Sequence, residues 1–387
     1  MQRENEAVLK KNTLVLILGL AGFISAADNW FVSPVLPAIA KGFNTVVTQA
    51  GNILTAYMIP YGIMQPFYGF VSDRWGKAKV LKWIVFGLAL GTVGCAFAGS
   101  LRMLCLWRAI TGFFAAGIIA VSLALIGDNV LPQERQVYVG KFMGILFFGQ
   151  GLSVGLGGVL AKYFSWRIAF GFFAVMAACV LLFLQRVPNY SPFRLRVKFL
   201  SEVKRVVLTQ KGRIIFPLAM VTGFLLLGLY SYLGAYLHEV TGLDYLQVGI
   251  VVMFYGFSCM LAGSQVGKLE QKLGRKKIVI IGGCFALSAA LLLIVFSGWQ
   301  TGWVATISLG FGYIFIQSTL ATIAFDVATE SKGLPSALVG LGLFGGGGLG
   351  SAFSSWLLHQ GGYSILWLTF SIGMMIFIMI AAKLRFD

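Results

Sequence analysis

Twelve apolar stretches run through the 387-residue chain, and each is long enough to cross a bilayer as a helix. A hydrocarbon core about 30 Å thick needs about 20 apolar residues, and backbone groups in lipid must find partners within their own span. The first six expected spans are Thr13 to Ile39, Gln49 to Val71, Trp83 to Gly99, Leu104 to Ile126, Phe142 to Ala161 and Ile168 to Leu184. The other six are Ile214 to Leu237, Leu246 to Val266, Ile278 to Gly298, Gly302 to Phe325, Leu334 to Leu358 and Tyr363 to Ala382. This pattern predicts an all-α membrane protein with twelve transmembrane helices.

The composition excludes a soluble protein, since 58% of the residues are hydrophobic and only 11% are charged, against about a quarter in soluble domains. The net charge of +17 would suit nucleic acid, but the basic residues lie between apolar spans and not on one water-facing surface. We therefore expect no nucleic-acid partner. The five cysteines lie within or at the ends of apolar spans and are expected to be core residues, not disulfides.

One long hydrophilic stretch, Arg186 to Arg213, separates six spans from six. It predicts an N-terminal six-helix bundle over 1–185, a cytoplasmic basic linker over 186–213 and a C-terminal bundle over 214–387. The linker pattern is that of an amphipathic helix over Pro192 to Gly212 on an anionic leaflet, with a calmodulin-like or nucleic-acid target as the alternative. The basic and apolar residues in this pattern are Arg194, Arg196, Lys198, Lys204, Arg205 and Lys211 with Leu195, Phe199, Val203 and Val206.

The basic residues also predict the orientation, because Lys and Arg gather in cytoplasmic loops. With the N-terminus inside, the inner segments hold 25 of the 30 Lys and Arg, and Arg108 lies within a span. The outer loops hold only Lys41, Arg102, Lys162 and Arg167. Both termini are therefore expected to face the cytoplasm.

An internal repeat relates the two halves. The segment Gly69 to Lys79 follows the second span, and the segment Gly267 to Lys277 follows the eighth, 198 residues later. Both segments place a second glycine seven residues after the first, at Gly76 and Gly274. Two similar six-helix halves around a midplane cavity are the architecture of many secondary transporters.

The segment after the second span resembles the signature of the major facilitator superfamily, in which a glycine is followed by an acid, a basic residue, and a second glycine with basic residues. The matching residues are Gly69, Asp73, Arg74, Gly76, Lys77 and Lys79. The resemblance implies that the first five form a gate, with the acid meeting the start of the eleventh span at Gly333. In the second half Gln271 replaces the acid, which implies one gate lock and not two.

Two formal charges lie inside the spans, Asp28 in the first and Arg108 in the fourth. Charges in a membrane usually face a cavity or each other. The sequence Arg108 to Gly112 is similar to a family signature that has been linked to proton transfer. Asp28 could be a proton carrier, a counter-charge for a cationic substrate, or one member of a fixed ion pair with Arg108 that joins two helices.

The fifth span partly resembles the antiporter motif of the same family. Its glycines include Gly140, Gly149, Gly157 and Gly158, but Ser153 and Val154 replace the expected Gly-Pro pair. Small residues that permit close helix contact would explain the same run.

The resemblance also implies a substrate cavity lined by eight of the spans. Its expected polar and aromatic residues are Asn29, Tyr57, Tyr61, Gln65, Gln150, Tyr230, Tyr232, Tyr255 and Gln317. Such side chains can stack on and hydrogen-bond to an amphipathic ligand, and each could equally be a packing residue or an interfacial anchor.

No enzyme is expected. The Gly151 to Gly155 string mimics a nucleophile elbow but lies inside a span, and the glycines near Gly340 lack the strand context of a dinucleotide site. His238 and His359 stand alone, so neither a metal site nor a cofactor is expected.

Taken with these motifs, the chain resembles the twelve-span drug:proton antiporter branch of the superfamily. The resemblance implies a monomeric transporter in a bacterial-type plasma membrane that exports a small amphipathic or drug-like compound against entering protons, in contact with membrane lipids. An exporter or importer of a specific metabolite, such as a sugar, nucleoside, siderophore or lysophospholipid, is the alternative. A receptor or scaffold that does not transport is the more distant one.

Overall fold

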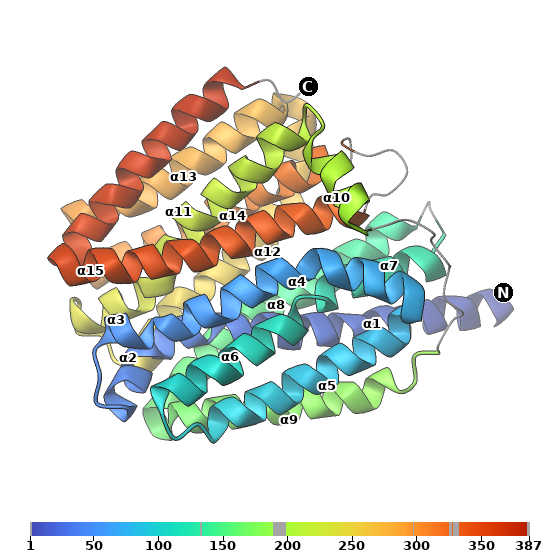
Figure 1. Ribbon diagram of the computed structural model, residues 1–387, viewed down its shortest axis with the longest axis horizontal. Coiled ribbons are helices and arrows are strands. Elements are labelled where there is room, and N and C mark those ends of the chain that lie inside the picture. The colour runs from blue at the N-terminus through green and yellow to red at the C-terminus, as the bar shows by residue number, and fades with distance from the viewer. Residues whose placement is uncertain are drawn as a thin grey trace.

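The computed structural model describes residues 2–131, 134–188, 199–296, 298–324, 327 and 333–384, without the side chains of residues 2–10, 73, 136 and 333. The described residues are almost entirely helical and form two groups of six membrane rods joined through a short linker helix (Figure 1). The fold class predicted from the apolar stretches is confirmed.

In the first half, three of the expected spans are each built from two helical pieces. The elements are α1 (Gln2–Trp30), α2 (Val32–Gly42), α3 (Val47–Ala50), α4 (Asn52–Trp75), α5 (Lys77–Ala96), α6 (Leu101–Ala115), α7 (Ile118–Asn129), α8 (Arg135–Tyr163) and α9 (Trp166–Leu184). The first span is α1 with α2, the second is α3 with α4, and the fourth is α6 with α7.

The second half begins after the linker helix α10 (Phe199–Val207). Its elements are α11 (Gly212–Glu239), α12 (Tyr245–Leu273), α13 (Arg275–Val295), α14 (Trp299–Ala324) and α15 (Gly333–Lys383). The last of these is two rods, because Gly361 and Gly362 leave helical geometry, with φ of +69° at Gly362. A glycine adopts that left-handed conformation without the steric cost that a Cβ would bring.

Ten described segments are long and apolar enough to cross a membrane, counting α6 with α7 as one and α15 as one. Dividing α15 at its break adds one crossing. Helix α4, which is not among these ten, adds the twelfth, since its 24 residues would extend about 36 Å at the helical rise of 1.5 Å per residue.

The break in the first span has a local cause. Pro34 and Pro37 lack the N–H groups that would bond the carbonyls of Trp30 and Ser33. Pro34 is instead tolerated in the first turn of α2, where amide groups have no helical partner. The chain therefore ends α1 at Trp30 and starts α2 at Val32.

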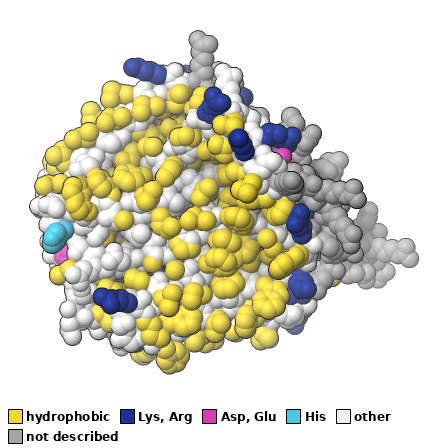
Figure 2. Space-filling model, in the orientation of Figure 1, with side chains coloured by type: hydrophobic (Ala, Val, Ile, Leu, Met, Phe, Trp, Pro, Cys, Tyr) yellow, Lys and Arg dark blue, Asp and Glu magenta, His cyan; other side chains and the backbone are white. Residues whose placement is uncertain are grey.

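The outer surface suits contact with lipid. Figure 2 shows hydrophobic side chains spread over most of one face, with Lys and Arg mainly along its upper and right margins. Large apolar side chains such as Leu90, Leu182 and Ile372 are more than half exposed. In water such a surface would aggregate, whereas in a bilayer it is the lipid contact.

The ends of the rods define two sides of the molecule. The N-terminus, the C-terminus and α10 lie toward one end in Figure 1, which we call the linker side, and the end of α2 and the α15 break lie toward the other, the far side. On the linker side Gly76 and Gly274 both have positive φ, of 93° and 83°. Each therefore makes a turn between two rods that other residues would adopt only with strain.

The linker helix differs from the expected one in extent and in contacts. Its described part covers Phe199–Val207 and ends before the expected Gly212, while residues 192–198, with Arg194, Arg196 and Lys198, lie outside the described residues. Its apolar face packs on protein, with the Phe199 ring 4.6 Å from that of Phe67 on α4, and Val206 buried with Leu338 of α15. The exposed side chains of Lys204 and Arg205 lie on the opposite face.

The two halves meet along two long pairs of helices. Helix α4 packs along α15 and α8 packs along α12, while α2 adds a shorter contact with α11. The domain boundaries at residues 185 and 214 remain predictions.

Candidate functional site

The two charges inside the spans form one buried ion pair in the first half. Arg108 Nη1 donates to Asp28 Oδ2 at 2.8 Å and to the Asp28 backbone carbonyl at 2.9 Å. Thr92 Oγ1 donates to the other carboxylate oxygen, Asp28 Oδ1, at 2.9 Å. Both charged side chains are fully buried. The carboxylate thus has partners from α5 and α6, which matches the cost of leaving a charge alone in a membrane.

The break in the first span helps to place this pair. Asp28 lies two residues before the end of α1, where backbone carbonyls lose their helical partners. Arg108 satisfies one of these carbonyls and the carboxylate with the same nitrogen. Its guanidinium also lies 4.2 Å from the centroid of the Tyr57 ring. Arg108 Nε and Nη2 have no hydrogen-bond partner among the described residues, and the face of the Tyr57 ring lies beside their guanidinium group.

Gly112 explains the spacing of the Arg108 to Gly112 signature. A Cβ at this position would lie 2.1 Å from the Tyr57 carbonyl oxygen. Only a glycine lets α6 approach α4 closely enough to set Arg108 against the Tyr57 ring.

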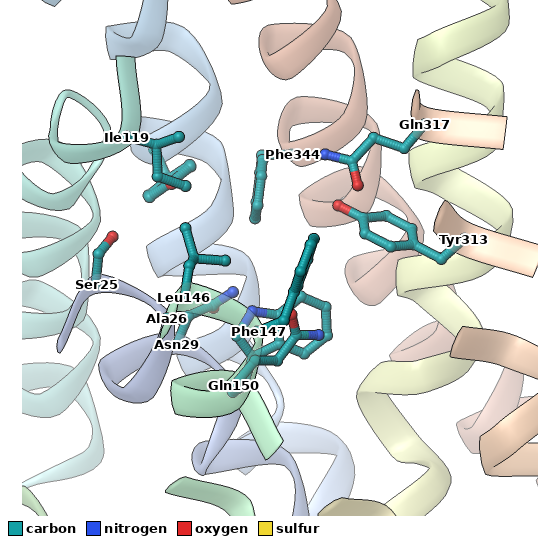
Figure 3. A pocket seen from close by; sticks show the side chains of 12 residues that line it. Ser25, Ala26, Asn29, Ile119, Leu146, Phe147, Gln150, Tyr313, Gln317 and Phe344 are labelled. Atoms are coloured by element: carbon teal, nitrogen blue, oxygen red, sulfur yellow. The ribbon is translucent and has the colours of Figure 1, made fainter. Parts of the chain in front are cut away.

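A cavity of about 50 Å³ lies between the two halves, beside this pair (Figure 3). At about 10–15 Å³ per water it has room for a few waters, well below the 300–1,000 Å³ typical of ligand pockets. It is lined from both halves by Ser25, Ala26, Asn29, Trp30, Tyr61, Ile119, Leu146, Phe147, Gln150, Tyr313, Gln317 and Phe344. In this conformation the cavity is therefore too small for a drug-sized compound.

Polar atoms without partners gather at the cavity. Ser25 Oγ, Asn29 Oδ1, Gln150 Nε2 and Gln317 Oε1 are buried and have no hydrogen-bond partner within the described part of the chain. Buried polar atoms are almost always paired with protein, water or ligand. These four groups come from α1, α8 and α14, and they are available to a polar occupant.

An aromatic cluster packs next to the cavity. Trp30 of the first half lies against three tyrosines of the second half, with ring centroids 4.8 Å from Tyr230, 5.0 Å from Tyr255 and 6.3 Å from Tyr313. Tyr230 and Tyr255 also contact each other at 4.5 Å. Because Trp30 and Tyr313 line the cavity as well, movement between the halves would change both the cluster and the cavity.

Asp28 itself is not among the cavity-lining residues. Its neighbour Asn29 lines the cavity, and Asp28 faces α5 and α6 inside the first bundle. Two stacked rings connect the regions, since Tyr61 lines the cavity and lies 5.5 Å from Tyr57, which contacts Arg108. A change at the ion pair can reach the cavity through this stack.

The expected substrate residues divide into three groups. Asn29, Tyr61, Gln150 and Gln317 line the cavity. Tyr57, Tyr230 and Tyr255 are buried immediately behind it. Gln65 lies against Gly340 of α15, and Tyr232 packs against Gly51 near the far side, so neither lines the described cavity.

Several lining residues were absent from the sequence expectation. Ser25 and Ala26 lie one turn before Asn29, Leu146 and Phe147 lie one turn before Gln150, and Tyr313 lies four residues before Gln317. Residues three and four apart share a helix face. This spacing was the available signal for them.

The far side is closed by direct contacts between the halves. Ser33 Oγ donates to the Tyr230 carbonyl at 3.1 Å, and Ser355 Oγ donates to the Thr48 carbonyl at 2.8 Å. Lys162 Nζ at the end of α8 lies 2.8 Å from the carboxylate of Asp244 at the start of α12. These bonds hold three inter-half contacts together.

Helices α8 and α12 diverge toward the linker side. Near the far side a Cβ on Gly158 would lie 2.5 Å from the Tyr245 carbonyl, and near the middle a Cβ on Gly256 would lie 2.2 Å from the Gly151 nitrogen. On the linker side the described positions Gly140, Gly144 and Gly267 have nothing within 4 Å. The glycines of the fifth span thus make close helix contact on the closed side and none on the other.

The gate segment lies at the turn between α4 and α5. Gly76 makes the turn, Lys77 Nζ pairs with Asp128 of α7 at 2.6 Å, and Arg74 lies over the Phe70 ring. Gly69 has open space around it. The side chain of Asp73 lies outside the described residues, so its expected contact with the start of the eleventh span remains a prediction.

The repeated loop in the second half is paired differently. Glu270 accepts from Arg275 at 3.1 Å within the same loop. It therefore does not take the place of the missing acid at Gln271.

Comparisons with known proteins agree on the family. The sequence profile of the Major Facilitator Superfamily matches residues 18–340. An uncharacterized transporter of Buchnera aphidicola subsp. Schizaphis graminum is 30% identical over 223 residues, which are 57% of this chain and 53% of that protein. The multidrug resistance protein fnx1 of Schizosaccharomyces pombe is 32% identical over 171 residues, 44% of this chain and 32% of that protein. The aligned region thus spans about half or less of these relatives.

Solved structures show the same fold over nearly the whole chain. The nucleoside transporter NupG has a TM-score of 0.78 at 14% identity, covering 95% of this chain and 98% of that one. A bacterial homolog of the human lysosomal transporter Spinster, in an inward-facing and unoccupied conformation, has a TM-score of 0.73 at 16% identity, covering 96% and 95%. With the family profile matching most of the chain, the protein belongs to the Major Facilitator Superfamily of membrane transporters.

Proposed function

We propose that this transporter couples proton entry to the export of a small amphipathic compound by alternating access of its two bundles. The linker side would be cytoplasmic, in a bacterial-type plasma membrane, because the loops there carry most of the Lys and Arg. The chain would act as a monomer without a cofactor, and the proton gradient would supply the energy.

The buried pair of Asp28 and Arg108 is the observation that carries the proposal. A protonated Asp28 no longer needs a counter-charge, whereas an ionised one does. Proton binding would therefore release the guanidinium of Arg108 from the carboxylate and leave it with the Asp28 backbone carbonyl and the Tyr57 ring. Since Tyr57 stacks on the cavity residue Tyr61, movement of Arg108 would shift both rings and so change the substrate site.

The other roles considered for Asp28 receive less support. As a counter-charge for a cation it would have to face the cavity, but its carboxylate is directed to Arg108 and Thr92. A fixed ion pair that only joins helices would need no link to the cavity. The Tyr57 and Tyr61 stack supplies such a link and favours a role in coupling.

In alternating access, the far side would open while the linker side closes. Opening the far side requires separating Lys162 from Asp244 and Ser33 from α11. The linker side would close by approach of α8 to α12, with the gate residues Asp73 and Arg74 against the start of α15. The basic residue Lys77 would hold the gate loop to α7 through Asp128.

A transporter of one specific metabolite is the second candidate. The small volume of the cavity favours it, because a multidrug site needs more room. The compared proteins include both a multidrug resistance protein and a nucleoside transporter, so they favour neither candidate.

The test is proton movement triggered by substrate. The full chain is reconstituted into liposomes that contain a pH-sensitive dye, and a panel of neutral, cationic and anionic compounds is added outside. We expect at least one compound to move protons with the wild type and none to do so with Asp28→Asn. Glu239→Gln, an exposed acid at the far end of α11, is the matched control and should retain the signal.

Proton movement that persists in Asp28→Asn would remove this residue from coupling. Substrate exchange without any proton movement in the wild type would show a uniporter or a different coupling ion.

A further inference from the structure

We infer that the cavity between the halves, once movement of the halves widens it, binds an uncharged compound with a planar ring and several hydrogen-bonding groups, in preference to a cation or an anion. This inference rests on the proposed transport function and names the class of substrate at the same site. It joins three observations, on charge, on polar atoms and on aromatic walls.

The lining carries no formal charge. None of the twelve lining residues is an acid, a lysine, an arginine or a histidine. A charged ligand that leaves water needs a counter-charge or several strong hydrogen bonds. The walls supply no such counter-charge, which disfavours both cations and anions.

The charges of Asp28 and Arg108 beside the cavity are already paired with each other. The Asp28 carboxylate accepts from Arg108 and Thr92, and the Arg108 charge is balanced by that carboxylate. The pair therefore presents no net charge to the cavity, and both side chains are fully buried. A ligand charge of either sign would find no partner there.

The polar atoms suit a neutral ligand. Asn29, Gln150 and Gln317 each end in a carboxamide, which offers one acceptor oxygen and two donor hydrogens. One atom of each, together with Ser25 Oγ, is buried without a partner among the described residues. Figure 3 shows Gln317 beside Tyr313 on one side of the cavity and Ser25 and Asn29 on the other. Carboxamides on opposite walls can pair with amide, carbonyl or hydroxyl groups along the edges of a ring.

Aromatic side chains form the remaining walls. Tyr61 and Phe344 lie 4.3 Å apart across the two halves, and Trp30 and Tyr313 belong to the neighbouring cluster. Flat aromatic walls bind planar rings by stacking.

The test compares small aromatic ligands of similar size that carry different charges. One trio is nicotinamide, 1-methylnicotinamide and nicotinate, and a second is acetanilide, phenyltrimethylammonium and phenylacetate. Their binding to the full chain in lipid nanodiscs is measured by ligand-induced thermal stabilisation at constant pH. We expect the neutral member of at least one trio to bind at least ten-fold more tightly than its charged partners.

Substitutions then tie the preference to the cavity. Gln317→Leu should weaken binding of the neutral member at least five-fold, and Gln317→Glu should shift the preference toward the cationic member. Gln150→Leu on the opposite wall should repeat the loss in case one variant folds poorly. Gln185→Leu, an exposed glutamine outside the cavity, is the matched control and should bind as the wild type does.

Several outcomes would overturn the inference. They are tighter binding of the cationic or anionic members, binding of none of the six compounds, or neutral binding that survives both cavity substitutions. Proton movement driven only by charged compounds would overturn this inference and leave the proposed function standing. Binding of neutral compounds without any substrate-driven proton movement would overturn the proposed function and leave this inference standing.

Discussion

The two halves of the molecule share a fold but differ in their interiors. The first half contains the ion pair of Asp28 with Arg108, supported by Thr92. The residues 198 positions later are Leu226, Thr306 and Ala290, all neutral and all buried. The second half therefore shows that six helices of this kind pack without a buried charge. This agrees with the proposed role of the first-half pair in coupling.

The two halves also share one aromatic position. Tyr57 and Tyr255 are also 198 residues apart, and both are fully or almost fully buried at the interface of cavity and bundle. Tyr57 lies against Arg108, whereas Tyr255 lies against Trp30 of the other half. The same position thus serves the charge pair in one half and the contact between halves in the other.

The largest effect is expected from breaking the ion pair. Arg108→Leu leaves the Asp28 carboxylate buried without its cation, which should lower the free energy of unfolding by about 3–5 kcal/mol. Thr306→Val at the equivalent position removes a hydroxyl that bonds only its own helix, to the Gly302 carbonyl at 2.6 Å, and should cost less than about 1 kcal/mol. Reversible unfolding in mixed micelles measures both. Equal losses of unfolding free energy in the two variants would mean that the buried pair contributes no more to stability than the neutral interior of the second half.

The comparison becomes sharper when both charges are removed. The double variant Asp28→Leu with Arg108→Leu makes the first half neutral, as the second already is. Replacing both members of a buried pair with apolar residues is often neutral or stabilising, so most of the lost stability should return. Substrate-driven proton movement should stay absent. If it reappeared with stability, coupling would lie outside the pair.

A smaller effect is expected where α8 and α12 cross. A Cβ on Gly256 would lie 2.2 Å from the Gly151 nitrogen, so Gly256→Ala should destabilise by about 1–3 kcal/mol in spite of its better helix propensity. Gly267→Ala in the same helix meets open space and should stabilise by about 0.5–1 kcal/mol. Thermal unfolding distinguishes opposite signs readily. The same sign at both sites would contradict the divergence of the two helices.

The smallest effect is expected at the far-side bridge. The hydrogen bonds from Lys162 and from the Gln247 amide hold the pKa of Asp244 below its ordinary value of 3.8. The contribution of an acid with a lowered pKa is present above its ordinary pKa and is lost as the pH falls through the lowered one. The Lys162–Asp244 ion pair should therefore stay intact between pH 5 and 8. Substrate-driven proton movement, in contrast, should depend on pH in this range.

Spin-label distances across the far side, between positions 163 and 240, can measure this. Asp244→Asn should raise the open fraction by at most about five-fold, as expected for an exposed ion pair. A strong response of the wild type within pH 5 to 8 that disappears in Asp244→Asn would assign pH sensing to the bridge.

Much of the fold follows from the sequence because lipid imposes simple rules. Apolar length predicted the spans, and the spacing of the glycines predicted the repeat; the structure adds that Gly76 and Gly274 have positive φ. Pro34 lies inside a span predicted to be continuous, and the structure shows a break beside it. Apolar content does not distinguish one long rod from two short ones with a turn between them.

The site was predictable in part. The pairing of Asp28 with Arg108 follows from the cost of lone charges in a membrane. Thr92 could not be found, because a threonine in an apolar span usually bonds its own helix, as this one also does with Leu88 at 2.8 Å. The packing of α10 on α4 and α15 was also missed, since an apolar helix face has the same pattern whether it meets lipid or protein.

The central claim is that Asp28, paired with Arg108 and separated from the cavity, carries the coupling proton. The most direct measurement compares substrate exchange with proton-driven accumulation of the same substrate, in liposomes containing the wild type or Asp28→Asn. The account predicts that exchange persists in the variant while accumulation against a gradient disappears. Accumulation at the wild-type level in Asp28→Asn would contradict it.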